Sequence, residues 1–171
     1  MIIMNTPVIA HEGIPYIIGD MVKTFCDSPI DIIAHQTNCC GVMGSGIAKA
    51  IAEEWNSVEQ EDKEYCLAND GDVAGTVLIC DVPGGWVANL YGQLLPGKNT
   101  DYNYLKASLK SLRRAIMTSD QHLVVGLPLI GCGVGGGDWS IVSEIIKEEL
   151  DDLEFYVFVL NDTVFNKVVA V

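Results

Sequence analysis

Six segments of the chain are runs of apolar, mostly β-branched or aromatic residues with the length of a β-strand. Since polar residues do not alternate regularly through them, we expect strands that are buried on both faces, as in a parallel sheet. Apolar residues at helical spacing lie between these runs, at 47–55, 105–116 and 141–146. Strands that alternate with helices predict an α/β sandwich with a mixed, largely parallel sheet. The expected strands are Ile14–Ile18, Ile30–Ala34, Thr76–Cys80, Trp86–Tyr91, Leu123–Leu127 and Phe155–Leu160.

The ends of the chain supply two smaller elements of the same domain. Residues 7–18 predict a hairpin that turns at His11–Gly13, and residues 164–169 predict a short amphipathic segment that packs on the sheet edge. A length of 171 residues is typical of one domain, so we expect a single domain over residues 1–171. With 49% hydrophobic and 19% charged residues, a disordered chain is excluded.

The chain is strongly acidic. It has 10 Lys and Arg against 23 Asp and Glu, which gives a net charge of −13 and a pI near 4.3. Such a field repels nucleic-acid backbones and anionic lipid surfaces, so we expect no broad nucleic-acid binding and no membrane partner. An anionic ligand would have to be held by backbone N–H groups and helix N-termini.

The cysteines and the N-terminus bear on metal binding and location. Six scattered cysteines show neither C-x-x-C spacing nor suitably spaced histidines, so no metal site is predicted. The first residues lack the basic region of a signal peptide, and no apolar stretch reaches the roughly 18 residues of a membrane span. From these features we expect reduced thiols and a cytoplasmic location.

Two glycine-rich loops follow predicted buried strands and precede predicted helices. The first covers residues 34–46, and the second covers residues 128–137 and ends at Asp138, a good helix N-cap. Ligands of open α/β sheets bind where strands end and helices begin. Five glycines within seven residues, at 131–137, let the backbone approach a ligand closely. The two loops therefore predict a site that clamps a diphosphate.

The two loops are also compatible with other interpretations. One glycine-rich turn alone is as consistent with a tight connection as with phosphate binding, whereas two such loops favour an anion site. The segment GVMGSG at 41–46 superficially matches a dinucleotide fingerprint, but it does not follow the first strand, and a polar helical stretch occupies 59–65. The chain has no G-K-[ST], which excludes a P-loop.

The order of these motifs resembles the macrodomain family, whose members are ADP-ribose-binding α/β modules. The elements GDM at 19–21, IIAHQTNCCGVMGSGIA at 32–48, ANLYGQ at 88–93 and LPLIGCGVGGGDW at 127–139 come in the order of the family. The resemblance covers residues 14–161 and implies a three-layer α/β/α sandwich. The glycine loops are most similar to the branch with ADP-ribose 1″-phosphate phosphatases and DNA-deADP-ribosylating antitoxins.

The resemblance assigns roles to individual residues. It places Asp20 and the Met21 N–H at the adenine and Asn38 at the distal ribose, and it gives the two phosphates to the N–H groups of the two glycine loops. Asn161 stands where family members often carry an aromatic residue beside the adenine. Phe158 or Phe165 could stack there instead. Taken alone, Asp20 would be interpreted as a helix cap and Asn38 as a turn residue. The expected ligand-binding residues are Asp20, Met21, Asn38, Gly44, Ser45, Gly46, Ile47, Gln93, Gly131, Cys132, Gly133, Val134, Gly135 and Asn161.

The resemblance also bears on catalysis. Gln93 stands at the position of the antitoxins' Lys, and Gly135 stands where related hydrolases have an Asp, so neither nucleophilic route is expected. His35 is then the expected base that positions or deprotonates water, and Asn38 aligns the ribose. The implied reaction is hydrolysis of ADP-ribose 1″-phosphate without metal or cofactor. The alternatives are removal of ADP-ribose from protein or nucleic acid, and a non-catalytic ADP-ribose sensor.

Overall fold

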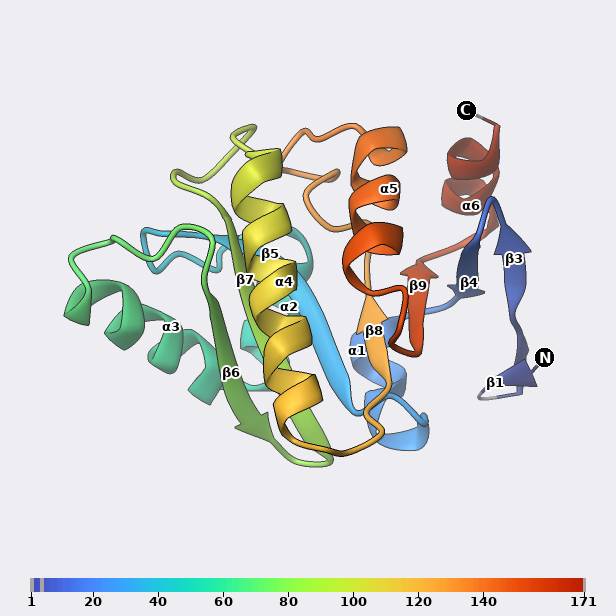
Figure 1. Cartoon of the computed structure of the whole chain (residues 1–171), viewed down its shortest axis with the longest axis horizontal. Helices are drawn as coiled ribbons and strands as arrows, with labels where there is room; N and C mark the ends of the chain where they lie inside the picture. Colours follow the sequence, from blue (N-terminus) through green and yellow to red (C-terminus); the bar gives the residue numbers. More distant parts are fainter. Residues whose placement is uncertain (1, 4, 171) are drawn as a thin grey trace.

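The computed structural model describes residues 2–3 and 5–170 and is built around one seven-stranded sheet (Figure 1). The strand order is β3-β4-β9-β8-β5-β7-β6, and a separate pair, β1-β2, lies at the N-terminus. The pairs β4-β9, β8-β9, β5-β8 and β5-β7 are parallel, whereas β3-β4 and β6-β7 are antiparallel. The predicted mixed, largely parallel sheet is confirmed. The strands are β1 (Ile2–Ile3), β2 (Thr6–Pro7), β3 (Ile9–His11), β4 (Ile14–Ile18), β5 (Ile32–Asn38), β6 (Val77–Val82), β7 (Gly85–Gln93), β8 (Val125–Leu127) and β9 (Phe155–Val159).

Helices cover both faces of this sheet, which confirms the three-layer sandwich. In Figure 1, α4 and α5 lie in front of the sheet, and α1, α2 and α3 lie behind it. Asp101 and Asp138 cap α4 and α5, because each side chain accepts a hydrogen bond from a backbone N–H of the first turn. The helices are α1 (Met21–Thr24), the 3-10 turn η1 (Phe25–Asp27), α2 (Gly46–Glu54), α3 (Asn56–Ala68), α4 (Tyr102–Thr118), α5 (Trp139–Glu149) and α6 (Asp162–Val169).

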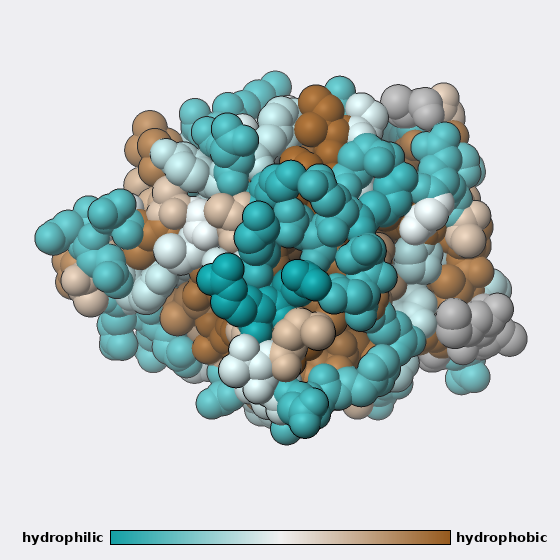
Figure 2. Space-filling model, in the orientation of Figure 1, coloured by the Kyte–Doolittle hydropathy of each residue, from teal (hydrophilic) through white to brown (hydrophobic). Residues whose placement is uncertain are grey.

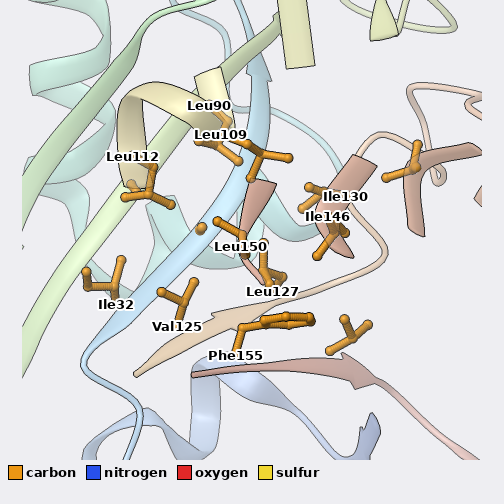
Figure 3. Packing of buried hydrophobic residues seen from close by; sticks show 14 of the residues in the cluster. Ile32, Leu90, Leu109, Leu112, Val125, Leu127, Ile130, Ile146, Leu150 and Phe155 are labelled. Carbon is orange, nitrogen blue, oxygen red and sulfur yellow. The ribbon is translucent and has the colours of Figure 1, made fainter. Parts of the chain in front are cut away.

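Each face of the sheet has its own hydrophobic core. On the front face, α4 contributes Leu105, Leu109 and Leu112, which are fully buried against strand residues such as Ile32 and Val125 (Figure 3). The four-residue and three-residue spacing of these leucines places them on one side of the helix. The outward side is polar, and Figure 2 shows that hydrophilic residues cover most of this face of the molecule.

The second core lies between the sheet and α1, α2 and α3. It includes Ile33, Ile51 and Val58, all with no exposed surface. Neighbouring β5 residues thus serve opposite cores: Ile32 and Ala34 face α4, whereas Ile33 faces α2. This alternation decides which way the polar residues that follow in β5 point.

The predicted hairpin is confirmed as β3-β4, with Glu12 and Gly13 at positive φ in its turn. The C-terminal segment is a helix, α6, and it packs against the front core beside β9 rather than on the sheet edge, with Phe165 edge-on to Tyr16 at 5.7 Å. The edge itself is formed by β3.

The largest difference from the expected elements concerns β5. The strand does not end at Ala34 but continues to Asn38 and pairs with β7 along its length. Its last four residues are polar, so apolar patterning does not reveal them as strand residues. The side chains of His35, Gln36 and Asn38 find hydrogen-bond partners within the fold, which makes their burial tolerable. The buried Thr37 hydroxyl has no hydrogen-bond partner among the described residues.

Among residues 2–3 and 5–170, no helix is long and apolar enough to cross a membrane. In the same part of the chain, no group of three or more His, Cys, Asp or Glu side chains is arranged to hold a metal ion. All six cysteines are free thiols.

Candidate functional site

A cavity of about 550 Å³ opens at the carboxyl ends of the parallel strands. This volume falls within the usual range of small-molecule sites, roughly 300–1,000 Å³. Its walls come from the end of β5, the start of α2, the loop between β8 and α5, the end of β9 and the residues just before α1. The predicted ligand-binding residues that line it are Asp20, Met21, Asn38, Gly44, Ser45, Gly46, Ile47, Gln93, Gly131, Cys132, Gly133, Val134 and Gly135.

The first glycine loop ends at the N-terminus of α2. Ser45 is the N-cap, but its side chain makes no capping hydrogen bond. In the described chain, the backbone N–H groups of Gly46, Ile47 and Ala48 therefore have no protein partner. They lie at the positive end of the helix and line the cavity, which makes this helix start a binding position for an anion.

The second glycine loop faces the first. Internal backbone hydrogen bonds fix its shape, among them Gly136 N to Gly133 O at 3.1 Å and Gly137 N to Gly131 O at 2.7 Å. The N–H groups of residues 133–135 have no partner within the described residues. A Cβ atom placed on Gly46 would lie 3.7 Å from Val134 Cγ2, so the two loops approach each other at the cavity. Unpaired donors thus line the cavity from two loops.

Gly133 differs from its neighbours in the second loop. A Cβ atom placed on it would meet no atom within 4 Å, so this position faces open space. By contrast, Gly131 and Gly136 have φ values of 70° and 72°, where glycine is strongly favoured. The glycine density of this loop is therefore partly a requirement of its own fold.

Asn38 lies in the cavity wall at an irregularity of the sheet. Thr37 pairs with Tyr91 and Asn38 pairs with Gln93, so Gly92 is an extra residue in β7. The Asn38 amide shapes the first loop: Nδ2 donates to Val42 O at 2.8 Å, and Oδ1 accepts from Cys40 N at 3.0 Å. One N–H and one lone pair of this amide are left for a ligand.

Asp20 and Met21 line the cavity at the start of α1. Asp20 Oδ1 accepts a hydrogen bond from Lys23 N at 3.0 Å, so this carboxylate is also the N-cap of the helix. Its second oxygen has no partner among the described residues. Asp20 can therefore both cap α1 and accept a hydrogen bond from a ligand.

His35 lies beneath the cavity and is not part of its wall. It has no exposed surface, and its Nε2 lies 2.6 Å from Asn89 Oδ1, so we place the ring proton on Nε2. Burial lowers the pKa of His35 to about 4, despite the hydrogen bond to Asn89. The ring is neutral at pH 7 and does not reach a ligand in the cavity. The role of water-activating base does not fit this position.

The His35 ring belongs to a buried polar network on the α3 side of the sheet. Asn89 Nδ2 lies 3.4 Å from Asp62 Oδ1, which also accepts a hydrogen bond from the Tyr91 hydroxyl at 2.6 Å. Burial raises the pKa of Asp62, and the hydrogen bonds from Tyr91 and Asn89 oppose that shift. This network links β5, β7 and α3 within the core.

Asn161 is the other predicted ligand residue that the structure does not bring to the cavity. It is exposed, and its Oδ1 accepts a hydrogen bond from Val164 N at 3.0 Å, so it is the N-cap of α6. Phe158, Leu160 and Val164 line that part of the cavity instead. Phe165 packs on Tyr16 outside the cavity wall.

Gln93 lines the cavity, but its side-chain amide already forms hydrogen bonds within the protein. Nε2 donates to Leu95 O at 2.6 Å and to Gly97 O at 3.1 Å, and Oε1 accepts from Gln36 Nε2 at 2.7 Å.

The sequence analysis did not identify Gln36 and Thr37, which also line the cavity. The signal that could have found Gln36 is the two-residue period of a strand, which puts it on the same face as Asn38.

The cavity wall carries little charge. Of the described residues that line it, none is Lys, Arg, His or Glu, and Asp20 has the one ionised side chain. The Cys132 thiol stays protonated because burial raises its pKa to about 12. An anion in this cavity would be bound by oriented N–H dipoles and not by formal positive charge.

The macro domain family model matches residues 34–146, the segment with both glycine loops. The chain belongs to the macro domain family. This macro domain is 28% identical to the 17.5 kDa protein of the tk-vs intergenic region of phage T4, over 84% of this chain and 94% of that protein. It is also 28% identical to a protein named ADP-ribose 1″-phosphate phosphatase from Lodderomyces elongisporus, over 86% of this chain and 99% of that protein.

Solved structures support the same fold. The macrodomain of Mycobacterium tuberculosis DarG superposes on this macro domain with a TM-score of 0.71 and 22% identity. The match covers 84% of this chain and 95% of the DarG chain.

Proposed function

We propose that this macro domain binds ADP-ribose and hydrolyses ADP-ribose 1″-phosphate to ADP-ribose and inorganic phosphate. The observation that carries the proposal is the pair of glycine loops. Among the described residues, their N–H groups are unpaired and no cationic side chain lines the cavity. A diphosphate between these loops would meet donors from both. The name of the Lodderomyces relative supports the choice of substrate.

The geometry of the cavity supports a set of protein contacts for this ligand. The N–H groups at the start of α2 would bind one phosphate, and those of residues 133–135 would bind the other. Asn38 would contact the distal ribose with the N–H and lone pair that its loop does not use. Asp20 would accept a hydrogen bond from the adenine amine through its free oxygen.

The choice of leaving group follows from the described residues of the cavity wall, which include no His, Lys or Glu that could serve as a general acid. In the proposed reaction, water attacks C1″ of the distal ribose, and the bond between C1″ and the bridging phosphate oxygen breaks with its electron pair staying on the phosphate. The new hydroxyl remains on C1″, and the proton that water loses ends on the released phosphate. A phosphate whose second pKa is about 6 departs readily without a general acid, unlike an alcohol or a nucleobase. Catalysis here would rest on orientation of substrate and water, with no role for His35.

A specific observation also favours a second candidate, a non-catalytic ADP-ribose-binding module. The only titratable side chains in the described cavity wall are Asp20, which the proposal assigns to adenine, and Cys132, whose thiol stays protonated. A wall with no general base near the distal ribose would serve binding alone.

Removal of ADP-ribose from DNA is less well supported. The Gln93 amide that stands at the position of the antitoxins' Lys donates both of its N–H groups to backbone carbonyls, and it carries no charge. DNA would also have to approach an acidic protein with a net charge of −13.

Two measurements on the purified protein test the proposal. Isothermal titration should show ADP-ribose binding at micromolar strength, about −8 kcal/mol. A phosphate-release assay with ADP-ribose 1″-phosphate should show turnover that Asn38→Ala lowers together with the affinity. Binding without phosphate release would favour the non-catalytic module. No binding at millimolar ADP-ribose would refute both candidates, and release of ADP-ribose from modified thymidine in DNA would refute the chosen substrate.

A further inference from the structure

Gln36 lies at the centre of a hydrogen-bond network that the proposed function does not use. Its Nε2 donates to Gln93 Oε1 at 2.7 Å and to Thr100 Oγ1 at 2.8 Å. The Thr100 hydroxyl in turn donates to Gly131 O at 2.8 Å. One side chain of β5 therefore connects the end of β7, the residue before the cap of α4, and the second glycine loop. We call these three side chains, Gln36, Gln93 and Thr100, the Gln36 network.

Backbone hydrogen bonds extend this network to the loop that follows β7. Gln93 fixes that loop through Leu95 O and Gly97 O, and the adjacent Pro96 and Gly97 line the cavity. Further along the chain, the backbone N–H of Thr100 donates to Gly135 O at 3.2 Å, and that of Asp101 donates to Gly92 O at 2.8 Å. The loop 94–101 thus lies between β7 and the second glycine loop and is bonded to both.

The network accounts for glycine at three positions. A Cβ atom on Gly92 would overlap the Gln36 amide, and one on Gly131 would lie 2.9 Å from Gln36 Oε1. A Cβ atom on Gly135 would overlap the Thr100 hydroxyl. These glycines pack closely around the Gln36 network, whereas a Cβ atom on Gly133 would meet nothing.

The donors of the network are used up by the protein itself. Both N–H groups of the Gln36 amide and both of the Gln93 amide point to protein acceptors. Gln36 Oε1 is buried and has no hydrogen-bond partner in the described chain, because it faces the glycine backbones. Although both glutamines line the cavity, their geometry serves to connect its walls.

We propose that Gln36 is a positioning residue: it ties the end of β7, the loop 94–101 and the loop 131–137 together, and so fixes the spacing of the cavity walls before a ligand binds. Walls fixed in advance lower the ordering cost of binding. The inference rests on the proposed function only for the ligand used to measure affinity. The order of the two loops can be measured without any ligand.

Hydrogen exchange of the ligand-free protein gives the first test. Gln36→Glu keeps the shape of the side chain but removes both N–H donors, and Thr100→Val removes the hydroxyl with little change of shape. In both variants we expect the backbone amides at positions 100 and 137 to exchange at least about tenfold faster, relative to the intrinsic rate of each sequence, since each loses neighbouring hydrogen bonds. Gln121→Glu makes the same chemical change at an exposed position at the opposite end of β8 and should leave these rates unchanged.

The affinity for ADP-ribose gives the second test. Gln36→Glu and Thr100→Val should each weaken binding by about tenfold or more, and Thr100→Ser, which keeps the hydroxyl, should weaken it less. Because both residues act through one network, the double variant should lose little more affinity than the weaker-binding single variant, whereas independent roles would multiply the losses.

The outcomes separate the two proposals. Faster exchange in both loops together with non-multiplying affinity losses supports the positioning role. Wild-type exchange rates in Thr100→Val and in any folded Gln36→Glu protein overturn it, whatever the protein binds. If the wild-type protein binds no ADP-ribose, the proposed function fails, and the exchange rates still decide the role of Gln36.

Discussion

The buried ring of His35 makes the stability of the protein depend on pH in a definite direction. Its folded-state pKa is about 4, against an ordinary value of 6.5, because burial disfavours the charged ring. Between these values the unfolded chain binds a proton that the folded protein does not. The contribution of His35 is therefore complete above pH 6.5 and is lost as the pH falls toward 4. The loss amounts to about 3 kcal/mol of unfolding free energy by pH 4.

Urea unfolding, followed by tryptophan fluorescence at several pH values from 4.5 to 7.5, measures this effect. Carboxylates also titrate in this range, so the comparison is with His35→Gln, whose amide can still donate to Asn89 Oδ1 but does not ionise in this range. Below pH 6.5, the unfolding free energy of the wild type should fall more steeply than that of the variant, by up to about 1.4 kcal/mol per pH unit. Parallel curves would refute the buried, neutral ring. A folded His35→Gln protein should also keep its rate of phosphate release. A fall of about 10²-fold or more in that rate, at unchanged ADP-ribose affinity, would instead support His35 as the base that activates water.

Three further predictions concern the cavity and the core. Gly133→Val should weaken ADP-ribose binding at least about tenfold while the melting temperature stays close to that of the wild type, because the added side chain occupies open space at the cavity; normal affinity in titration would show that this position does not face the ligand. Raising NaCl from 50 to 500 mM should change the ADP-ribose dissociation constant by less than about threefold, since none of the described residues that line the cavity is cationic. A change of about tenfold would point to charges outside the described wall. Leu109→Ala should lower the free energy of unfolding, measured with urea, by about 2–5 kcal/mol, because this α4 side chain is fully buried against the sheet. A loss below about 1 kcal/mol would contradict the packing described for that helix.

The glycine loops could be predicted because both their position after buried strands and their composition can be recognised from neighbouring residues in the sequence. The buried position of the His35 side chain could not be predicted in this way. The apolar run that predicts β5 stops at Ala34, so His35 was expected at the end of the strand, whereas pairing with β7 continues the strand to Asn38 and buries the ring. Sequence patterning could not show this, because the extension depends on pairing with a strand more than 50 residues away.

Asn161 and Gln36 show two other limits of the sequence. Asparagine is common both as a helix N-cap and as a residue that hydrogen-bonds a ligand. In the structure, Asn161 is the N-cap of α6. Gln36 has no motif of its own, and its role becomes visible only when Gln93 and Thr100, both far along the chain, are brought to it. Contacts between distant segments decide both cases.

The unpaired backbone N–H groups of the two glycine loops have a consequence for the energetics of any anion that they bind. Amide N–H groups, unlike lysine or histidine side chains, neither take up nor release protons near neutral pH. For a ligand whose phosphates keep their charge throughout this pH range, such as the diphosphate of ADP-ribose, binding through these groups should therefore be uncoupled from proton exchange. Its calorimetric enthalpy should then be the same in buffers with small and large heats of ionisation. The occupancy of such a cavity depends on the concentration of its ligand and not on pH near neutrality.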